Sequence, residues 1–134
     1  MTGVQTCALL ISGSDSKTII VTNVAPTVTA SFAASSLSCG ANNATLNVSF
    51  IDPGTLDTHS AVINWGDGNT QTLSSVTSPF SVSHTYALVG TYTATVTVTD
   101  NDGGVDTKTA TATVNFNTSG ILQPIDANGT SVFK

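Results

Sequence analysis

Short stretches in which apolar and polar residues alternate dominate the middle of the chain. In residues 91–99 (TYTATVTVT), Tyr92, Ala94, Val96 and Val98 share one side and threonine fills the other. A period of two is the spacing that places side chains on one face of a β-strand. The other stretches of this kind are 28–32, 46–50, 61–65, 70–74, 80–84 and 108–116. About seven short strands, each with one wet face, predict an all-β fold, an antiparallel sandwich of two sheets.

The charge of the chain argues against several classes of function. The net charge is −5, there is no arginine, and the lysines are Lys17, Lys108 and Lys134. Nucleic-acid binding is not expected, because it needs clustered cations that contact phosphates. An anionic membrane surface would also repel the chain. No apolar run approaches the roughly 20 residues of a membrane span, so no membrane insertion of this segment is expected.

The flanks differ from the central stretch. Residues 12–18 (SGSDSKT) resemble residues 103–109 (GGVDTKT), with Gly, Asp, Lys and Thr at matching positions. We therefore interpret residues 12–23 as the last strand of a preceding repeat plus the start of an NVAP linker, whose proline favours an extended connection. Residues 24–117 are predicted to form one domain. Residues 118–134, where the composition shifts, are predicted to be the truncated start of a following domain.

The first eleven residues are interpreted separately. Residues 1–11 (MTGVQTCALLI) resemble the translation of a common short-read sequencing adapter, with Leu10 in place of a proline. We interpret them as an artefact in a metagenomic fragment, in which case Cys7 is foreign and Cys39 is a lone thiol. The alternative is a signal-peptide remnant, although no basic region precedes the short CALLI stretch. The pairing of Cys39 stays open, because an even cysteine count in a secreted chain also suggests a disulfide.

Several short motifs follow one another in a characteristic order. WGDG at residues 65–68 is followed by HTY at 84–86, GTY at 90–92 and VTVTD at 96–100. This order resembles the signature of the polycystic-kidney-disease (PKD) domain in its bacterial and archaeal extracellular form. The resemblance implies an immunoglobulin-like β-sandwich, often present as a tandem repeat, in cell-surface proteins or beside the catalytic domains of secreted hydrolases. It implies an extracellular location and no catalysis by the domain itself.

The motif residues are predicted to be structural. Trp65 is expected to fill the centre between the sheets, as the strand-C tryptophan of immunoglobulin folds does. Tyr92 lies on the apolar side of its strand. The hydroxyl of Tyr86 is expected to bond to the backbone near the Gly90 turn, because buried tyrosines need a partner. The predicted structural set is Trp65, Gly66, Asp67, Gly68, Tyr86 and Tyr92.

No pattern in the sequence indicates catalysis. The histidines are His59 and His84, and neither lies beside a nucleophile motif such as GxSxG. No His or Cys cluster has zinc spacing, and no glycine-rich phosphate loop opens a helix. We therefore expect no catalytic residues and no bound cofactor, apart from the calcium considered below. The predicted role is a spacer and interaction module that makes protein–protein or adhesive contacts with neighbouring repeats, other surface proteins or polysaccharide.

Carbohydrate binding is the main alternative. A carbohydrate-binding accessory module of a secreted hydrolase would present aromatic side chains to a polysaccharide. The alternation assigns most aromatic residues of the domain to the interior, but it leaves Phe80 and Tyr86 ambiguous.

Four aspartates predict a calcium site at the end of the domain where the linker enters. In an immunoglobulin-like topology, the loops after the second and sixth main strands lie at the same end. These loops carry Asp52 and Asp57, then Asp100 and Asp102. Carboxylates and loop carbonyls are the oxygen ligands that calcium takes. The alternative is that each aspartate bonds its own turn and stays solvated.

Overall fold

The computed structural model describes residues 4–11, 15–38, 42–115 and 128. The strands in this part of the chain are β1 (Val4–Ile11), β2 (Asp15–Thr22), β3 (Thr27–Phe32), β4 (Ser36–Ser38), β5 (Asn43–Ile51), β6 (His59–Asn64), β7 (Thr70–Val76), β8 (Phe80–Thr85), β9 (Gly90–Asp100) and β10 (Val105–Asn115). None of the described residues belongs to a helix with the length and hydropathy that a membrane crossing requires.

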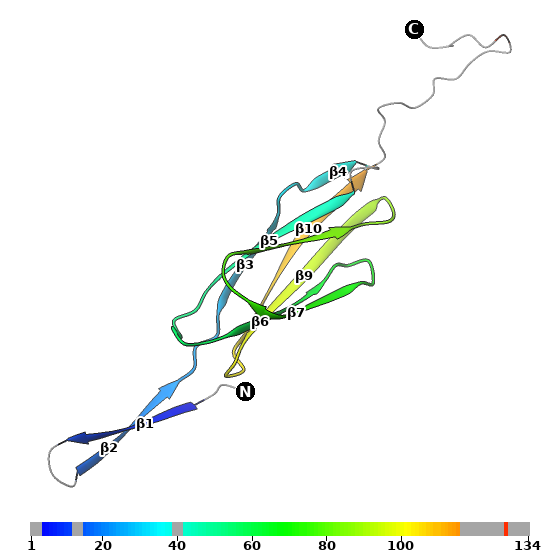
Figure 1. Ribbon diagram of the computed structural model, residues 1–134. Helices are drawn as coiled ribbons and strands as arrows, with labels where there is room; N and C mark the ends of the chain where they lie inside the picture. The colour runs from blue at the N-terminus through cyan, green and yellow to red at the C-terminus, as the bar shows by residue number, and fades with distance from the viewer. Residues whose placement is uncertain (1–3, 12–14, 39–41, 116–127, 129–134) are drawn as a thin grey trace.

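Strands β3 to β10 form a sandwich of two sheets (Figure 1). One sheet has the order β3-β5-β8 and the other has the order β4-β10-β9-β6-β7. Neighbouring strands are antiparallel except β4 and β10, which run parallel. The predicted all-β, immunoglobulin-like sandwich is confirmed. The sandwich strand missing from the predicted set is β4, a segment of three residues that is too short for alternation to be recognised.

The core lies between the sheets and consists of the predicted inward side chains. Along β9, Ala94, Val96 and Val98 are buried, while the threonines between them are more exposed. The same alternation runs through β5 and β6. Burial of apolar surface is the main favourable term in folding, so this pattern fixes which face of each strand points inward.

The sandwich has two ends. We call the end where the chain enters the proximal pole and the opposite end the distal pole. The proximal pole comprises the NVAP linker (residues 23–26) and the loops 52–58 and 101–104. The distal pole comprises the turn 66–69 and the loop 86–89. Strands β3 and β10 both start at the proximal pole, and β10 ends at the opposite end of the molecule (Figure 1). The chain therefore enters and leaves the domain at opposite poles.

The segment before the linker is a separate hairpin. Strand β2 pairs with β1 in antiparallel register, from Val4↔Thr22 to Ile11↔Asp15, and it joins neither sheet of the sandwich. Residues 12–22 are predicted to be the last strand of a preceding repeat, and within them residues 15–22 form a strand that pairs with β1. The predicted following domain, Cys39 and Phe116 lie outside the described residues, apart from Asn128.

Candidate functional site

An aromatic cluster extends from the distal pole into the core. Trp65 follows β6 directly and only 1% of its surface is exposed. Its ring stacks on His84 of β8, with centroids 4.6 Å apart and planes inclined by 10°. The expected position of Trp65 between the sheets is what the burial shows, and it leaves no face of the ring for a ligand.

Asp67 and His84 form an ion pair beside this tryptophan. His84 Nε2 lies 2.7 Å from Asp67 Oδ2, and both side chains are largely buried. Asp67 also accepts bonds of 3.0 Å from the backbone N–H and the side-chain amide of Asn69. Desolvation raises the pKa of Asp67, but these bonds and the charge of His84 outweigh it and lower the pKa to about 2. Sequence analysis did not pair His84 with Asp67, although both belong to the recognised motifs.

Tyr86 and Tyr92 each hydrogen-bond a backbone carbonyl oxygen through the side-chain hydroxyl. Tyr86 is fully buried, and its hydroxyl donates to the carbonyl oxygen of Trp65 at 3.0 Å. The bond to the backbone near the Gly90 turn, expected from Tyr86, is instead made by Tyr92, whose hydroxyl donates to Leu88 O at 2.9 Å. Burial and the nearby charge of Asp67 raise the pKa of Tyr86 to about 12. Tyr86 is therefore no sugar platform.

Gly66 in this turn has a physical requirement for glycine. Its φ is +81°, a region that side-chain-bearing residues avoid. A Cβ at this position would lie 2.5 Å from Thr93 O, so strand β9 leaves no room for one. Gly68, with φ +94°, needs glycine for its backbone conformation alone, since nothing lies near its Cβ position. The predicted structural role of both glycines follows from this geometry.

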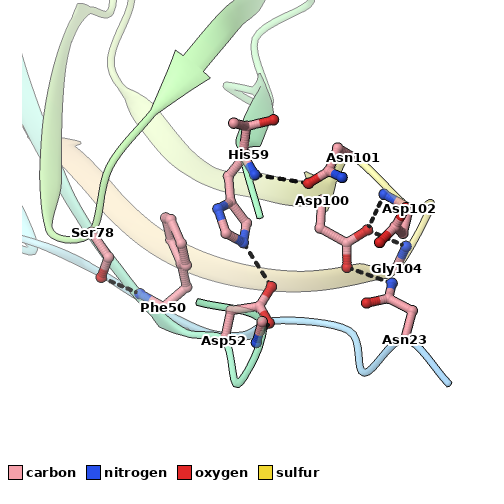
Figure 2. A network of polar contacts seen from close by, with 11 residues as sticks. Asn23, Phe50, Asp52, His59, Ser78, Asp100, Asn101, Asp102 and Gly104 are labelled. Carbon is pink, nitrogen blue, oxygen red and sulfur yellow. Dashed lines mark hydrogen bonds and ion pairs between the residues drawn. The ribbon is translucent and has the colours of Figure 1, made fainter. Parts of the chain in front are cut away.

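Three of the four predicted calcium ligands gather at the proximal pole. Asp52, Asp57 and Asp100 each offer a carboxylate oxygen, and these oxygens lie within 4.8 Å of one another. Asp102 is not in this group of three, but its backbone N–H donates to Asp100 Oδ1 at 2.9 Å. The immunoglobulin-like topology thus brings together loops that are far apart in sequence, as expected (Figure 2).

Two of these carboxylates, those of Asp52 and Asp100, already have hydrogen-bond partners in the protein. Asp52 Oδ1 accepts from Gly54 N at 2.8 Å, and Asp52 Oδ2 lies 2.7 Å from His59 Nε2. Asp100 is buried, and its Oδ1 accepts from Gly104 N at 2.7 Å (Figure 2). Turn bonding, the alternative to calcium, therefore occurs at Asp52 and Asp100. It does not exclude a cation, because a carboxylate oxygen accepts more than one bond.

Asp57 carries the uncompensated charge of this group. Desolvation, followed by the charges of Asp52, Asp102 and Asp100, raises the pKa of Asp57, while His59 acts in the opposite direction. At Asp100, desolvation also raises the pKa, but hydrogen bonds from Asn23 and three backbone groups outweigh it and lower the pKa. The proximal pole therefore combines two different carboxylates. Hydrogen bonds stabilise the ionised form of Asp100, whereas desolvation and neighbouring negative charges disfavour the ionised form of Asp57.

The linker is tied to the proximal pole by two aspartates. Asn23 Nδ2 donates to Asp100 Oδ2 at 2.8 Å (Figure 2). At the start of β3, Val28 N donates to Asp106 Oδ2 at 2.8 Å, and this bond is the largest of the causes that lower the pKa of Asp106. Sequence analysis missed Asn23 and Asp106, and the only signal for Asp106 was its place in the internal repeat.

The surface hollows formed by described residues of the sandwich include a larger and a smaller one. The larger, about 340 Å³, is lined by Phe80 together with polar side chains of β3 and β5, such as Thr29 and Asn47. The smaller, about 260 Å³, lies at the proximal pole between Phe50 and His59. Phe80, which the sequence left ambiguous, is half-buried and packs against the core.

The described fold and the packed aromatic cluster define an immunoglobulin-like β-sandwich module. Residues 23–115 match the family model of the PKD domain, and the chain therefore belongs to the PKD domain family. PKD domains are typically extracellular, generally non-catalytic modules of multidomain proteins. Among curated protein sequences, none matches the chain significantly.

Solved structures of PKD domains share the fold. The PKD1 domain of Epp from Vibrio anguillarum is similar with a TM-score of 0.55 and 23% identity, over 71% of this chain and 99% of that domain. The PKD domain of an M14-like peptidase from a Thermoplasmatales archaeon is similar with a TM-score of 0.55 and 23% identity, over 68% of this chain and 93% of that domain.

Proposed function

We propose that the chain is a non-catalytic extracellular spacer and interaction module of a larger cell-surface or secreted protein, in which it makes protein–protein or adhesive contacts. The observation that carries this proposal is the fastening of the linker to the proximal pole through Asn23 and Asp100. A module that only held a neighbouring domain on a loose tether would need no such anchor. Entry and exit at opposite poles also suit a spacer, because they add the full length of the sandwich to the chain.

Activity panels test the non-catalytic part of this proposal. Purified protein should turn over no ester, peptide or glycoside substrate. A turnover that disappears in either His59→Ala or His84→Ala, with the variant still folded by circular dichroism, would overturn it. Turnover that survives both substitutions and follows the protein through purification would also overturn it.

Carbohydrate binding remains a second candidate because of the hollow beside Phe80. Its polar lining could bond sugar hydroxyls, and Phe80 could support one sugar face. A pull-down with insoluble polysaccharides tests this. Retention that is lost in Phe80→Ala but kept in Leu88→Ala, an exposed apolar control in the loop that follows β8, would favour the alternative.

We further propose that calcium binds at the proximal pole, held by Asp52, Asp57 and Asp100, with Asp102 adding negative charge. Three carboxylate oxygens within 4.8 Å fit the oxygen ligands that calcium prefers. A bound divalent cation would neutralise the repulsion that raises the pKa of Asp57. It would also stiffen the joint, because Asp100 already holds the linker.

Thermal melts with calcium and with chelator test the calcium proposal. The parent should melt at a higher temperature with calcium, by the mass-action effect of a ligand that binds only the folded state. The double variant Asp52→Asn with Asp100→Asn should lose that calcium-dependent difference. A parent that melts identically with calcium and with chelator, while retaining the linker, would contradict the proposal.

A further inference from the structure

The proximal pole carries exposed apolar side chains beside its carboxylates. Leu56 is 91% exposed and Ile51 is 78% exposed, and Val24 and Val105 are exposed as well. Ile51 ends β5 next to the start of β3, and Gly104, which precedes Val105, lies against the linker. These four residues lie at the pole where the chain enters, and we call them the apolar rim. Large exposed aliphatic side chains grouped at one end of a domain mark an interaction surface.

The short linker limits where a preceding domain can lie relative to the apolar rim. Residues 23–26 are four residues, which span at most roughly 14 Å when fully extended. Asn23 is bonded to Asp100, and Pro26 is buried. The chain before Asn23 therefore starts at the surface of the proximal pole. A folded domain attached there has to lie against the apolar rim or beside it.

The distal pole offers a matching surface. In its loop 86–89, Leu88 is 73% exposed and Val89 is also exposed. The charged groups in its described turn and in the adjoining β8 are Asp67 and His84, which pair with each other. A distal pole of this kind presents apolar side chains without surplus negative charge, so the aspartates of a proximal pole do not repel it.

We propose that the apolar rim is the docking surface for the distal pole of a preceding repeat of the same type, whose loop equivalent to residues 86–89 packs on Leu56 and Ile51. This inference rests on the proposed spacer function and on the likeness of residues 12–18 to residues 103–109. The contact is head to tail, so it builds an open row rather than a closed dimer. A small interface suffices, because the short linker makes the contact intramolecular at high effective concentration.

A duplicated chain tests the proposal. It consists of residues 1–115 followed directly by residues 23–134, so that the second copy keeps Asn23 and its bond to Asp100. Residual dipolar couplings should show that the two copies share one alignment tensor, and the duplicated chain should melt at a higher temperature than the single chain. Two copies that align independently in the folded duplicated chain would overturn the proposal.

The duplication also provides matched controls within one molecule. Leu56→Asp in the second copy and Leu88→Asp in the first copy lie at the proposed contact, and each should abolish the shared alignment. The same two substitutions in the opposite copies face no repeat, and they should leave the alignment intact. An equal effect in both copies would mean that the substitution acts on the fold of each copy, and it would contradict docking. If the two copies align independently and show no enzymatic turnover, the docking proposal is wrong and the spacer function is unaffected. Enzymatic turnover would instead contradict the proposed function.

Discussion

An Asp–His pair lies at each pole of the sandwich, and the two pairs have the same length but different surroundings. Asp67–His84 at the distal pole and Asp52–His59 at the proximal pole both measure 2.7 Å. In the distal pair Asp67 is the single carboxylate, and the ring of His84 stacks on Trp65. At the proximal pole, Asp57 and Asp100 crowd the same place as Asp52.

The difference shows that an Asp–His pair alone does not mark a binding site. The charges of the other carboxylates around the pair distinguish the two poles. Among the described residues of the distal pole, Asp67 has His84 as its partner and its pKa falls to about 2, which is the pattern of a structural element. At the proximal pole desolvation and neighbouring carboxylates raise the pKa of Asp57. The contrast fits a structural role for the distal cluster and the attachment that we propose for the proximal pole.

The largest expected effect concerns the distal cluster. Trp65→Ala should lower the free energy of unfolding by about 3–5 kcal/mol, because a large buried ring leaves a cavity between the sheets. For a domain of this size that is a large part of a total of about 5–15 kcal/mol. Denaturant melts measure the change. An unchanged midpoint would break the comparison, since Trp65 would then contribute nothing to stability.

A smaller loss is expected when the distal pair is broken. Asp67→Asn should cost about 1–2 kcal/mol at neutral pH, because a charge-assisted hydrogen bond to His84 is lost. Since the folded pKa of Asp67 is lowered to about 2 from 3.8, its stabilisation is present above pH about 4 and is lost as the pH falls toward 2. Melts of parent and variant across this range should converge at the acid end. A constant difference at all pH values would exclude the ionised pair as the cause.

The opposite sign is expected at the proximal pole. With chelator present, Asp57→Asn should raise the unfolding midpoint at neutral pH, because it removes a charge that its neighbours repel. The folded pKa of Asp57 is raised, so its ionisation lowers stability as the pH rises through that pKa, and the variant should lack this loss. Leu56→Asn in the same loop is the control without charge removal. If Asp57→Asn destabilises in chelator, the excess negative charge is not what distinguishes this pole.

The smallest effect is expected from the hairpin. Deletion of residues 1–22 should change the free energy of unfolding of the sandwich by less than about 0.5 kcal/mol, because β1 and β2 pair with each other and not with either sheet. Deletion of residues 1–23 should cost more, since it also removes the bond from Asn23 to Asp100. Equal melts for the two deletions would show that the anchor of the linker adds nothing to stability.

Most of the fold could be predicted from local pattern, because burial repeats every second residue. The inward positions of β5, β6 and β9 follow directly from alternation. Strand β4 could not be predicted in this way. It is only three residues long, and it is extended because β10 provides a partner in parallel register.

Some contacts of the candidate sites could also be predicted from the sequence, and others could not. The meeting of Asp52, Asp57 and Asp100 followed from the topology, which places their loops at one end. The pairing of His84 with Asp67, and of Val28 N with Asp106, requires the register between strands that are distant in sequence. Hydrophobic alternation decides which face is buried, but it carries no information on which polar side chains meet across the fold.

The parallel pairing of β4 with β10 has a mechanical consequence. The residues of β4 register with 113–115 of β10, and Thr113 N donates to Ser35 O at 2.9 Å. A force that pulls on the linker at one pole and on the end of β10 at the other slides these strands past each other in shear. The bonds that join them then resist together, whereas antiparallel strands pulled from one end unzip one bond at a time. Tension at the end of β10 would load this patch directly, whereas tension at the linker would first load the bond from Asn23 to Asp100 and the pairing of β3. The few hydrogen bonds of the patch would therefore help to set the extension at which a module begins to yield.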